Sequence, residues 1–279
     1  MGNRAFDACY NPEEINVFVS FNFVTFISYL LVVVVGGTQV FLYLSKKYQW
    51  ERQDKSPVGF LQDIQDALIY NVVLFLFGNY SHTFSIWTVL AFFAGLIGFA
   101  LLGELPFLKV SLVTWRTWSR EAWMVHIGGV GIVFILAIYH FVQAYYAGIL
   151  SLYFTGLLVG LGLMVAGPAV NWYEEYRRRE IAYVTPTIDP PTQSDKQEVA
   201  KPTNGVSLRV TEKEIARVKS WPKYRVHLHH WQIFYLLAFF TRFPSVLGQI
   251  CSGLVLGIFM HGGSAYGFDP LLEQEGVSY

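Results

Sequence analysis

The chain has 279 residues, of which 53% are apolar and only 14% are charged, and its mean hydropathy is +0.38. Its net charge is zero, which argues against electrostatic capture of nucleic acid. Its two cysteines cannot form a disulfide framework. This composition predicts an integral membrane protein that has the lipid bilayer as a partner and no large soluble domain.

Apolar segments that can cross a bilayer recur along the chain. The first, 17–44, holds 28 residues without a charged side chain, whereas about 20 suffice to cross the hydrocarbon core. The segments 67–80 and 231–243 are shorter, and such segments can be tilted, re-entrant or shielded by neighbours. The sequence predicts an all-α, polytopic transmembrane helical bundle of about seven spans, or six if 67–80 does not cross. The predicted spans are 17–44, 67–80, 84–103, 122–147, 149–170, 231–243 and 246–261.

Basic residues gather on one side of this predicted bundle. With seven spans and an outside N-terminus, 18 of the 20 Lys and Arg residues fall on the inner side, and only Arg4 and Arg242 lie outside. Inner loops of membrane proteins carry such an excess of positive charge. We therefore expect the loop 171–225 and the C-terminus to face the cytoplasm or the matrix of an organelle. The six-span alternative spoils this asymmetry.

One long polar stretch divides the chain into three parts. We expect 1–170 to form an N-terminal membrane bundle of five spans, 171–225 an inner-side polar loop, and 226–279 a C-terminal helical hairpin with a tail. The charged run 173–180 is expected to continue the fifth span as a solvated helix. A capping-box pattern that begins at Thr211 predicts a short surface helix within the loop. The loop is too small and too polar to bury a catalytic core.

Small residues spaced one helical turn apart occur on three predicted spans. In lipid, such faces let two helix backbones approach closely. They predict packing within the bundle rather than dimerisation, because glycine is common in membrane helices in any case. The pairs are Gly156 with Gly160, Gly253 with Gly257, and Ala91 with Gly95.

A histidine-rich segment before the last two predicted spans is the most distinctive motif. His227, His229 and His230 lie within four residues, and His261 follows later. If the last two spans form a hairpin, its ends meet at the inner face. Neutral imidazoles bind zinc, iron or copper, so these four histidines are the candidate metal ligands. Alternatively, they are interface residues that hydrogen-bond to backbone carbonyls or lipid headgroups, because their spacing does not specify one metal.

Two more histidines lie on the predicted fourth span. His126 and His140 are about 21 Å apart along a helix and point to nearly the same side. This arrangement resembles one half of the ladder by which cytochrome b subunits hold two haems. His126 and His140 are therefore the candidate cofactor-binding residues for haem. An interhelical hydrogen bond is the alternative role for His140.

The C-terminal membrane region contains the pattern His229-His230-Trp231, Thr241-Arg242, Ser252-Gly253, Gly257-Ile258-Phe259, Gly262 and Ala265-Tyr266-Gly267-Phe268-Asp269. This pattern resembles a region of fungal LCCL-domain multi-pass membrane proteins and covers about a sixth of the chain. The resemblance implies a membrane module of unassigned activity and supplies no mechanism. The chain has no room for an LCCL domain and lacks its cysteines. His261 stands where the family has an amide residue.

Three functions fit these patterns. The sequence favours a non-catalytic structural or accessory subunit of a membrane assembly, with other membrane subunits as partners, because no recognised catalytic pattern is present. One alternative is a membrane-embedded metal- or haem-binding enzyme that uses the inner-face histidines. Another is a transporter or receptor of small ligands. Whether the protein is an enzyme stays open, and zinc, iron and haem are the candidate cofactors.

Overall fold

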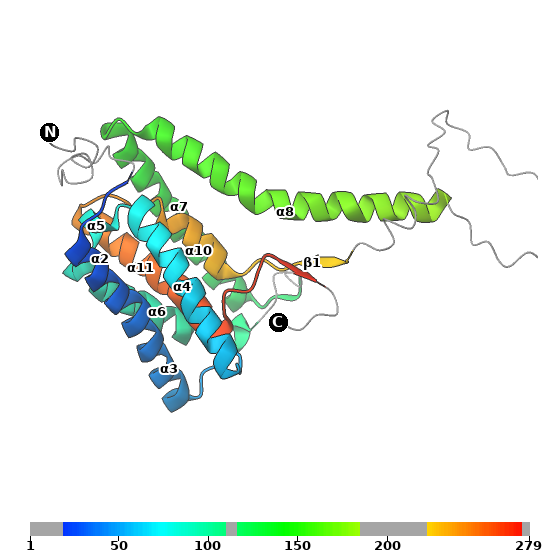
Figure 1. Cartoon of the computed structure of the whole chain (residues 1–279), viewed down its shortest axis with the longest axis horizontal. Helices are drawn as coiled ribbons and strands as arrows, with labels where there is room; N and C mark the ends of the chain where they lie inside the picture. Colours follow the sequence, from blue (N-terminus) through cyan, green and yellow to red (C-terminus); the bar gives the residue numbers. More distant parts are fainter. Residues whose placement is uncertain (1–18, 110–115, 185–221, 275–279) are drawn as a thin grey trace, which may run out of the picture. The chain divides into compact units, whose positions relative to one another are not determined.

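The computed structural model describes residues 19–109, 116–184 and 222–274, and Figure 1 shows that helices dominate them. This confirms the predicted all-α helical bundle. The helical elements are α2 (Phe23–Leu30), the π-helical η1 (Leu31–Gly36), α3 (Gly37–Tyr48), α4 (Pro57–Phe77), α5 (Tyr80–Thr83), α6 (Ile86–Gly103), the short 3₁₀ turn η2 (Pro106–Leu108), α7 (Arg120–Tyr146), α8 (Leu150–Val184), α10 (His230–Ala238) and α11 (Val246–Tyr266).

Six helices in the described part of the chain are long and apolar enough to cross a membrane. The first runs without interruption through α2, η1 and α3, and the other five are α4, α6, α7, α8 and α11. The chain is thus a multi-pass membrane protein with several apolar helices. Many large apolar side chains on these helices are exposed, and a lipid bilayer is the environment that suits such a surface.

The predicted span 231–243 needs a correction, because its helical part is short. α10 (His230–Ala238) has nine residues and is about 13 Å long, less than half of the hydrocarbon core. The helix cannot continue easily toward Pro244, because proline disfavours helical geometry at the preceding residue. The short predicted segment 67–80, by contrast, mostly belongs to the 21-residue helix α4. The six long helices are therefore not those of the six-span alternative, which omitted 67–80.

The non-helical stretch that follows α10 is stabilised by side chains from other parts of the bundle. Backbone carbonyl groups at membrane depth need a hydrogen-bond donor, and irregular backbone is tolerated there only where protein or water supplies one. Four carbonyls between positions 240 and 244 each accept a hydrogen bond from a side chain. The donor–acceptor pairs are Tyr153 to Phe240, Ser252 to Thr241, Asn79 to Arg242 (2.9 Å) and Gln249 to Pro244 (2.9 Å).

The core of the bundle is centred on α11, which packs closely along α6. A Cβ atom at Gly257 would lie 2.7 Å from the backbone nitrogen of Leu96, and one at Gly95 would lie 2.7 Å from the carbonyl oxygen of Leu254. Such distances leave room only for hydrogen at both positions. The predicted small-residue faces of these two helices therefore pack against each other within the bundle.

The chain divides into two compact units. The first comprises Met1–Gly160 and Leu228–Asp269, and the second comprises Leu161–His227 and Pro270–Tyr279. α8 passes from the first unit into the second. The first unit contains the other described helices, including the two that carry His230 and His261.

The second unit contains the remainder of α8 and a two-stranded antiparallel sheet. The strands are β1 (Tyr224–Val226) and β2 (Leu272–Gln274), with Val226 opposite Leu272. α8 continues to Val184, which confirms the predicted helical continuation over 173–180. The predicted surface helix at Thr211 lies outside the described residues.

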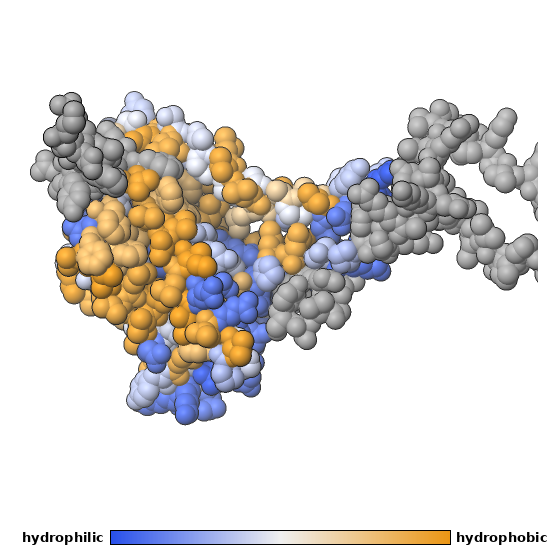
Figure 2. Space-filling model, in the orientation of Figure 1, coloured by the Kyte–Doolittle hydropathy of each residue, from blue (hydrophilic) through white to orange (hydrophobic). Residues whose placement is uncertain are grey.

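The first unit has two chemically different ends. At one end the backbone nitrogen of Gln53 donates to the carbonyl of Ala265 (2.8 Å), which joins the α3–α4 loop to the end of α11. We call this the histidine end, because His261 lies near this end of α11. At the opposite end, the Ser20 hydroxyl donates to the Asn79 side chain (2.9 Å). Figure 2 shows apolar residues over most of the bundle and hydrophilic residues gathered where α3 ends and α4 begins.

Candidate functional site

Two of the predicted metal ligands meet at the histidine end of the bundle. His230 is the first residue of α10, and His261 lies near the end of α11. Their ring centres are 5.7 Å apart and the ring planes make an angle of 35°. The two helices are antiparallel neighbours, joined by the non-helical stretch after Ala238. This connection brings together side chains that are 31 positions apart in the sequence.

Gly262 makes room for this pair. A Cβ atom at this position would lie 2.8 Å from Nε2 of His230 and 2.6 Å from Cβ of Trp231. The His230 ring therefore points its Nε2 atom at the backbone of the residue that follows His261. Any side chain at position 262 would push the His230 ring away.

Aromatic rings enclose the histidine pair. The Phe99 ring centre is 5.0 Å from that of His230 and 5.2 Å from that of His261. Tyr266 contacts both rings as well, at 6.1 and 6.3 Å, and Phe41 contacts His261 at 5.3 Å. His261 is only 5% exposed. Nε2 of His230 and Nδ1 of His261 are buried, and neither has a hydrogen-bond partner among the described residues.

The other two predicted metal ligands have different positions. His229 is the N-cap residue of α10, and its backbone nitrogen donates to the Gln232 side chain (3.3 Å). His227 belongs to the second compact unit, where its backbone nitrogen donates to the carbonyl of Leu271 (2.9 Å). Within the described ranges, no group of three or more His, Cys, Asp or Glu residues is arranged to hold a metal ion. The close pair is therefore His230 and His261.

The two predicted haem ligands on α7 are in aromatic surroundings. Nδ1 of His126 lies 2.8 Å from the carbonyl oxygen of Ala122, and its ring contacts that of Trp118 at an angle of 39°, with centres 4.3 Å apart. His140 is buried, and its ring lies nearly parallel to that of Phe243, 5.8 Å away. Both contacts of His126 are with residues close to it in the sequence. Packing against Phe243 ties His140 to the non-helical stretch that follows α10.

A group of three charged residues lies beside the histidine pair. Lys109 Nζ is 3.0 Å from a Glu51 carboxylate oxygen and 3.1 Å from one of Glu104. The backbone nitrogen of Glu51 donates to Glu104 (2.6 Å), and this hydrogen bond is the main reason why the pKa of Glu104 is lowered. The three charges act electrostatically on the Tyr266 hydroxyl. The sequence alone does not reveal this group, because Glu51 and Glu104 are 53 positions apart.

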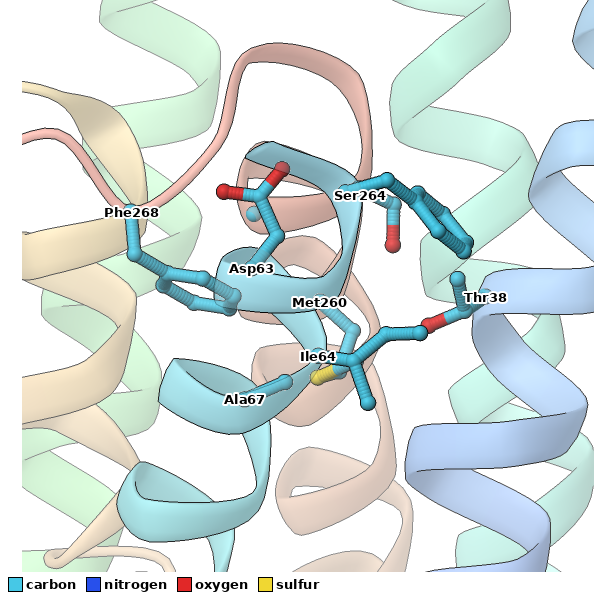
Figure 3. Close-up of a pocket in the computed structure, with 9 residues that line it drawn as sticks. Thr38, Asp63, Ile64, Ala67, Met260, Ser264 and Phe268 are labelled. Atoms are coloured by element: carbon cyan, nitrogen blue, oxygen red, sulfur yellow. The ribbon is translucent and has the colours of Figure 1, made fainter. Parts of the chain in front are cut away.

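A small pocket lies elsewhere at the histidine end, between α4 and α11. Figure 3 shows Asp63 and Phe268 at its upper side and Met260 deeper inside. Asp63 accepts two hydrogen bonds from Lys55 Nζ, at 2.8 and 2.6 Å. The pocket has a volume of about 20 Å³, which is room for roughly one water molecule.

Comparisons with family models, curated proteins and solved structures give no match. The chemistry of the site must therefore be inferred from its own residues. Burial among aromatic rings disfavours the charged form of an imidazole. The histidine pair thus offers neutral ring nitrogens, which are metal ligands and hydrogen-bond acceptors.

Proposed function

We propose that the protein is a non-catalytic structural or accessory subunit of a larger membrane assembly, and that α7 contacts the partner subunit. The observation that carries this proposal is a glycine-rich segment in the middle of α7. Leaving aside the helix's own backbone, no described atom lies within 4 Å of the place where a Cβ would stand at Gly128, Gly129 or Gly131.

Glycine inside a helix has a cost that close packing can offset. Each glycine lowers helix stability by about 1 kcal/mol relative to alanine. In α11, Gly253 and Gly257 lie against the backbone of α6, where close approach gains van der Waals contact. Three glycines in four residues of α7 have no such contact within the described chain. A helix from another protein that packs on this segment would supply it.

Burial along α7 supports the same conclusion. Three of its 27 residues are buried, against 12 of 21 in α11. Lipid can cover an apolar helix, but lipid gains nothing from a glycine in particular. Branched apolar side chains surround the glycine segment and are available for packing on a second helix. These exposed residues are Val125, Ile127, Val130, Ile132 and Val133.

The pocket in Figure 3 does not favour a transporter or receptor of small ligands. Sites for such ligands enclose about 300–1,000 Å³, whereas this pocket has about 20 Å³. It also contains Asp63, whose charge is paired with Lys55. The pocket therefore fits a hydrated gap between two helices better than a ligand site.

The charge distribution supports an orientation for this subunit. Lys46, Lys47, Lys55 and Lys109 all lie at or near the histidine end, and we infer that this end faces the cytoplasm or an organellar matrix. In a chain whose own cysteines, Cys9 and Cys251, are replaced by serine, a cysteine that replaces Lys47 should react with an impermeant maleimide only after the membrane is opened. Reaction in sealed vesicles of known right-side-out orientation would contradict this assignment.

Site-specific photo-cross-linking in native membranes tests the proposed subunit contact. A benzophenone side chain at Ile132, one turn from Gly128 and Gly129, should form an adduct with one discrete membrane protein. The same probe at Val24, an exposed residue of α2, is the matched control and should label lipid. Gly129→Leu should abolish the Ile132 adduct and reduce the size of the assembly on native gels.

Two results would contradict the proposal. Lipid labelling alone at both positions would show that α7 faces the bilayer and has no partner. An adduct of twice the chain mass would show that α7 contacts a second copy of this protein and not a different subunit.

A further inference from the structure

We propose that His230 and His261 bind a single copper(I) ion as a two-coordinate site at the histidine end of the bundle. This inference is independent of the subunit role assigned to α7. It depends on three features of the pair: the separation of the rings, the burial of two ring nitrogens that have no partner, and the number of ligands.

The separation of the rings matches one bridging ion. Metal–imidazole bonds are about 2 Å long and each nitrogen lies about 1 Å from its ring centre, so one ion between two imidazoles puts the centres about 6 Å apart. The observed separation is 5.7 Å. A direct hydrogen bond between the rings, with about 2.9 Å between nitrogens, would bring the centres closer, to about 5 Å.

Each ring of the pair has one buried nitrogen that no hydrogen bond from a described residue satisfies. Nε2 of His230 points at Gly262. The corresponding nitrogen of His261 is Nδ1. Both are buried and have no hydrogen-bond partner in the described part of the chain. A buried polar atom that lacks a partner is costly, and an ion held by both nitrogens would remove this cost at both rings.

The number of ligands selects the metal. Zinc in proteins takes four ligands, or three and a water, and haem or non-haem iron needs further axial or carboxylate ligands. No third His, Cys, Asp or Glu joins the pair within the described ranges. Monovalent copper, by contrast, forms stable linear or bent complexes with two imidazoles. Of the metals that imidazole binds well, copper(I) alone is satisfied by this pair.

The surroundings also suit a monovalent cation. The rings of Phe99 and Tyr266 each contact both imidazoles, and aromatic faces attract cations. Glu51 and Glu104 carry two negative charges against the single positive charge of Lys109. The residual negative charge beside Tyr266 would offset the single positive charge of copper(I). A divalent ion would instead leave one buried positive charge without a counter-charge.

The test is to load the full-length, detergent-purified protein with copper(I) under anaerobic conditions. The metal content is measured by mass spectrometry after competition with a copper(I) chelator, and the coordination is measured by X-ray absorption. We expect about one copper per chain with two nitrogen ligands at about 2 Å. The same titration with zinc should leave no retained metal.

Matched variants at position 230 separate ligand loss from misfolding. Thioether sulfur is a copper(I) ligand, so His230→Met should retain copper with one sulfur and one nitrogen ligand. His230→Leu, of similar size, should lose at least 90% of the copper while keeping the size-exclusion profile of the parent. His261→Leu should lose copper as well. His227→Leu, which changes an exposed histidine, is the control and should bind copper like the parent.

Three outcomes would overturn the proposal. The first is copper retention that His230→Leu does not change. The second is retained zinc or iron with three or more ligands. The third is a parent protein that is folded but binds no copper above the level of the His230→Leu variant.

Discussion

α11 and α7 are both apolar membrane helices, yet their environments differ greatly. α7 is longer and more apolar, but only 6% of its most apolar stretch is buried, against 61% for α11. α11 carries polar and small residues, among them Ser252, Gly257 and His261, and these are buried in the core. Apolar character therefore identifies a spanning helix but not the helix at the centre of the bundle.

The physical reason lies in the solvent. Lipid tails are as apolar as leucine, so burying a leucine between helices gains little over leaving it in lipid. Small residues gain van der Waals contact by close approach, and polar groups gain a hydrogen bond that lipid cannot supply. α11 has both kinds of residue facing its neighbours, while the glycines of α7 face outward from the described chain.

The largest expected effect is at the contact between α11 and α6. Gly257→Leu places a side chain against the carbonyl of Phe92 and 2.7 Å from the backbone nitrogen of Leu96, so the helices must separate. We expect a loss of about 3 kcal/mol or more in the free energy of unfolding, or failure to fold. Thermal unfolding in detergent, followed by size-exclusion fluorescence, measures it. A variant as stable as the parent would refute the central role of this contact.

A smaller effect is expected at a buried hydrogen bond between the first helix and α4. The Tyr29 hydroxyl donates to the Asn71 side chain (2.8 Å), and both residues are fully buried. Asn71→Ala should cost about 1–2 kcal/mol, because it leaves the tyrosine hydroxyl unpaired. The double variant Tyr29→Phe, Asn71→Leu should cost less than Asn71→Ala alone. Tyr43→Phe, at an exposed tyrosine, is the control, and equal losses in all variants would contradict the prediction.

The charged group at the histidine end predicts a small pH dependence. The folded state lowers the pKa of Glu104 from 4.5, so its ionised form contributes stability above pH 4.5. That contribution is lost as the pH falls through the lower, folded-state pKa. Glu104→Gln should therefore reduce thermal stability near neutral pH, by less than about 1 kcal/mol because water screens the charges. The difference in thermal stability between the variant and the parent should become smaller below pH 4.5. A difference that becomes larger there would contradict the prediction, because it would mean that folding raises the pKa of Glu104.

The smallest effect on the isolated chain is expected in α7. Gly129→Leu is matched to Gly257→Leu in residue types, but outside the helix's own backbone no described atom lies within 4 Å of the place of the new Cβ. Stability in detergent should stay the same or rise by up to about 1 kcal/mol, because leucine favours helix. The same thermal measurement tests this. Strong destabilisation would mean that α7 packs against its own chain, and the contrast between the two helices would then be lost.

Several features of the fold could be predicted because they depend on local sequence. The continuation of α8 beyond the apolar segment follows from a charged run that keeps helical spacing. Glu175 and Arg179 are one turn apart in this run, and Nε of Arg179 lies 3.2 Å from a carboxylate oxygen of Glu175. The packing of Gly253 and Gly257 within the bundle follows from small residues at helical spacing. The extent of α4 could not be predicted well, because its first three turns contain the charged residues Asp63 and Asp66.

The candidate site was predicted only in part. The hairpin argument placed His230 near His261, but the geometry leaves His229 as a helix cap and His227 in the other compact unit. Gly262 has no chemistry of its own, and only its position against the His230 ring shows what it does. Adjacent histidines look alike in a sequence, whereas the start of a helix turns them in different directions.

By itself, the sequence determined that this is a multi-pass helical membrane protein. The reason is that the free energy of transferring a segment into a bilayer is close to the sum of the contributions of its own residues. The tertiary structure alone decided which helix is central, how the stretch after α10 is stabilised, and which histidines meet. These outcomes depend on contacts between distant residues, such as Asn79 with Arg242, 163 positions apart. In lipid, apolar periodicity does not mark the inner face of a helix, so those contacts can be read only from the folded chain.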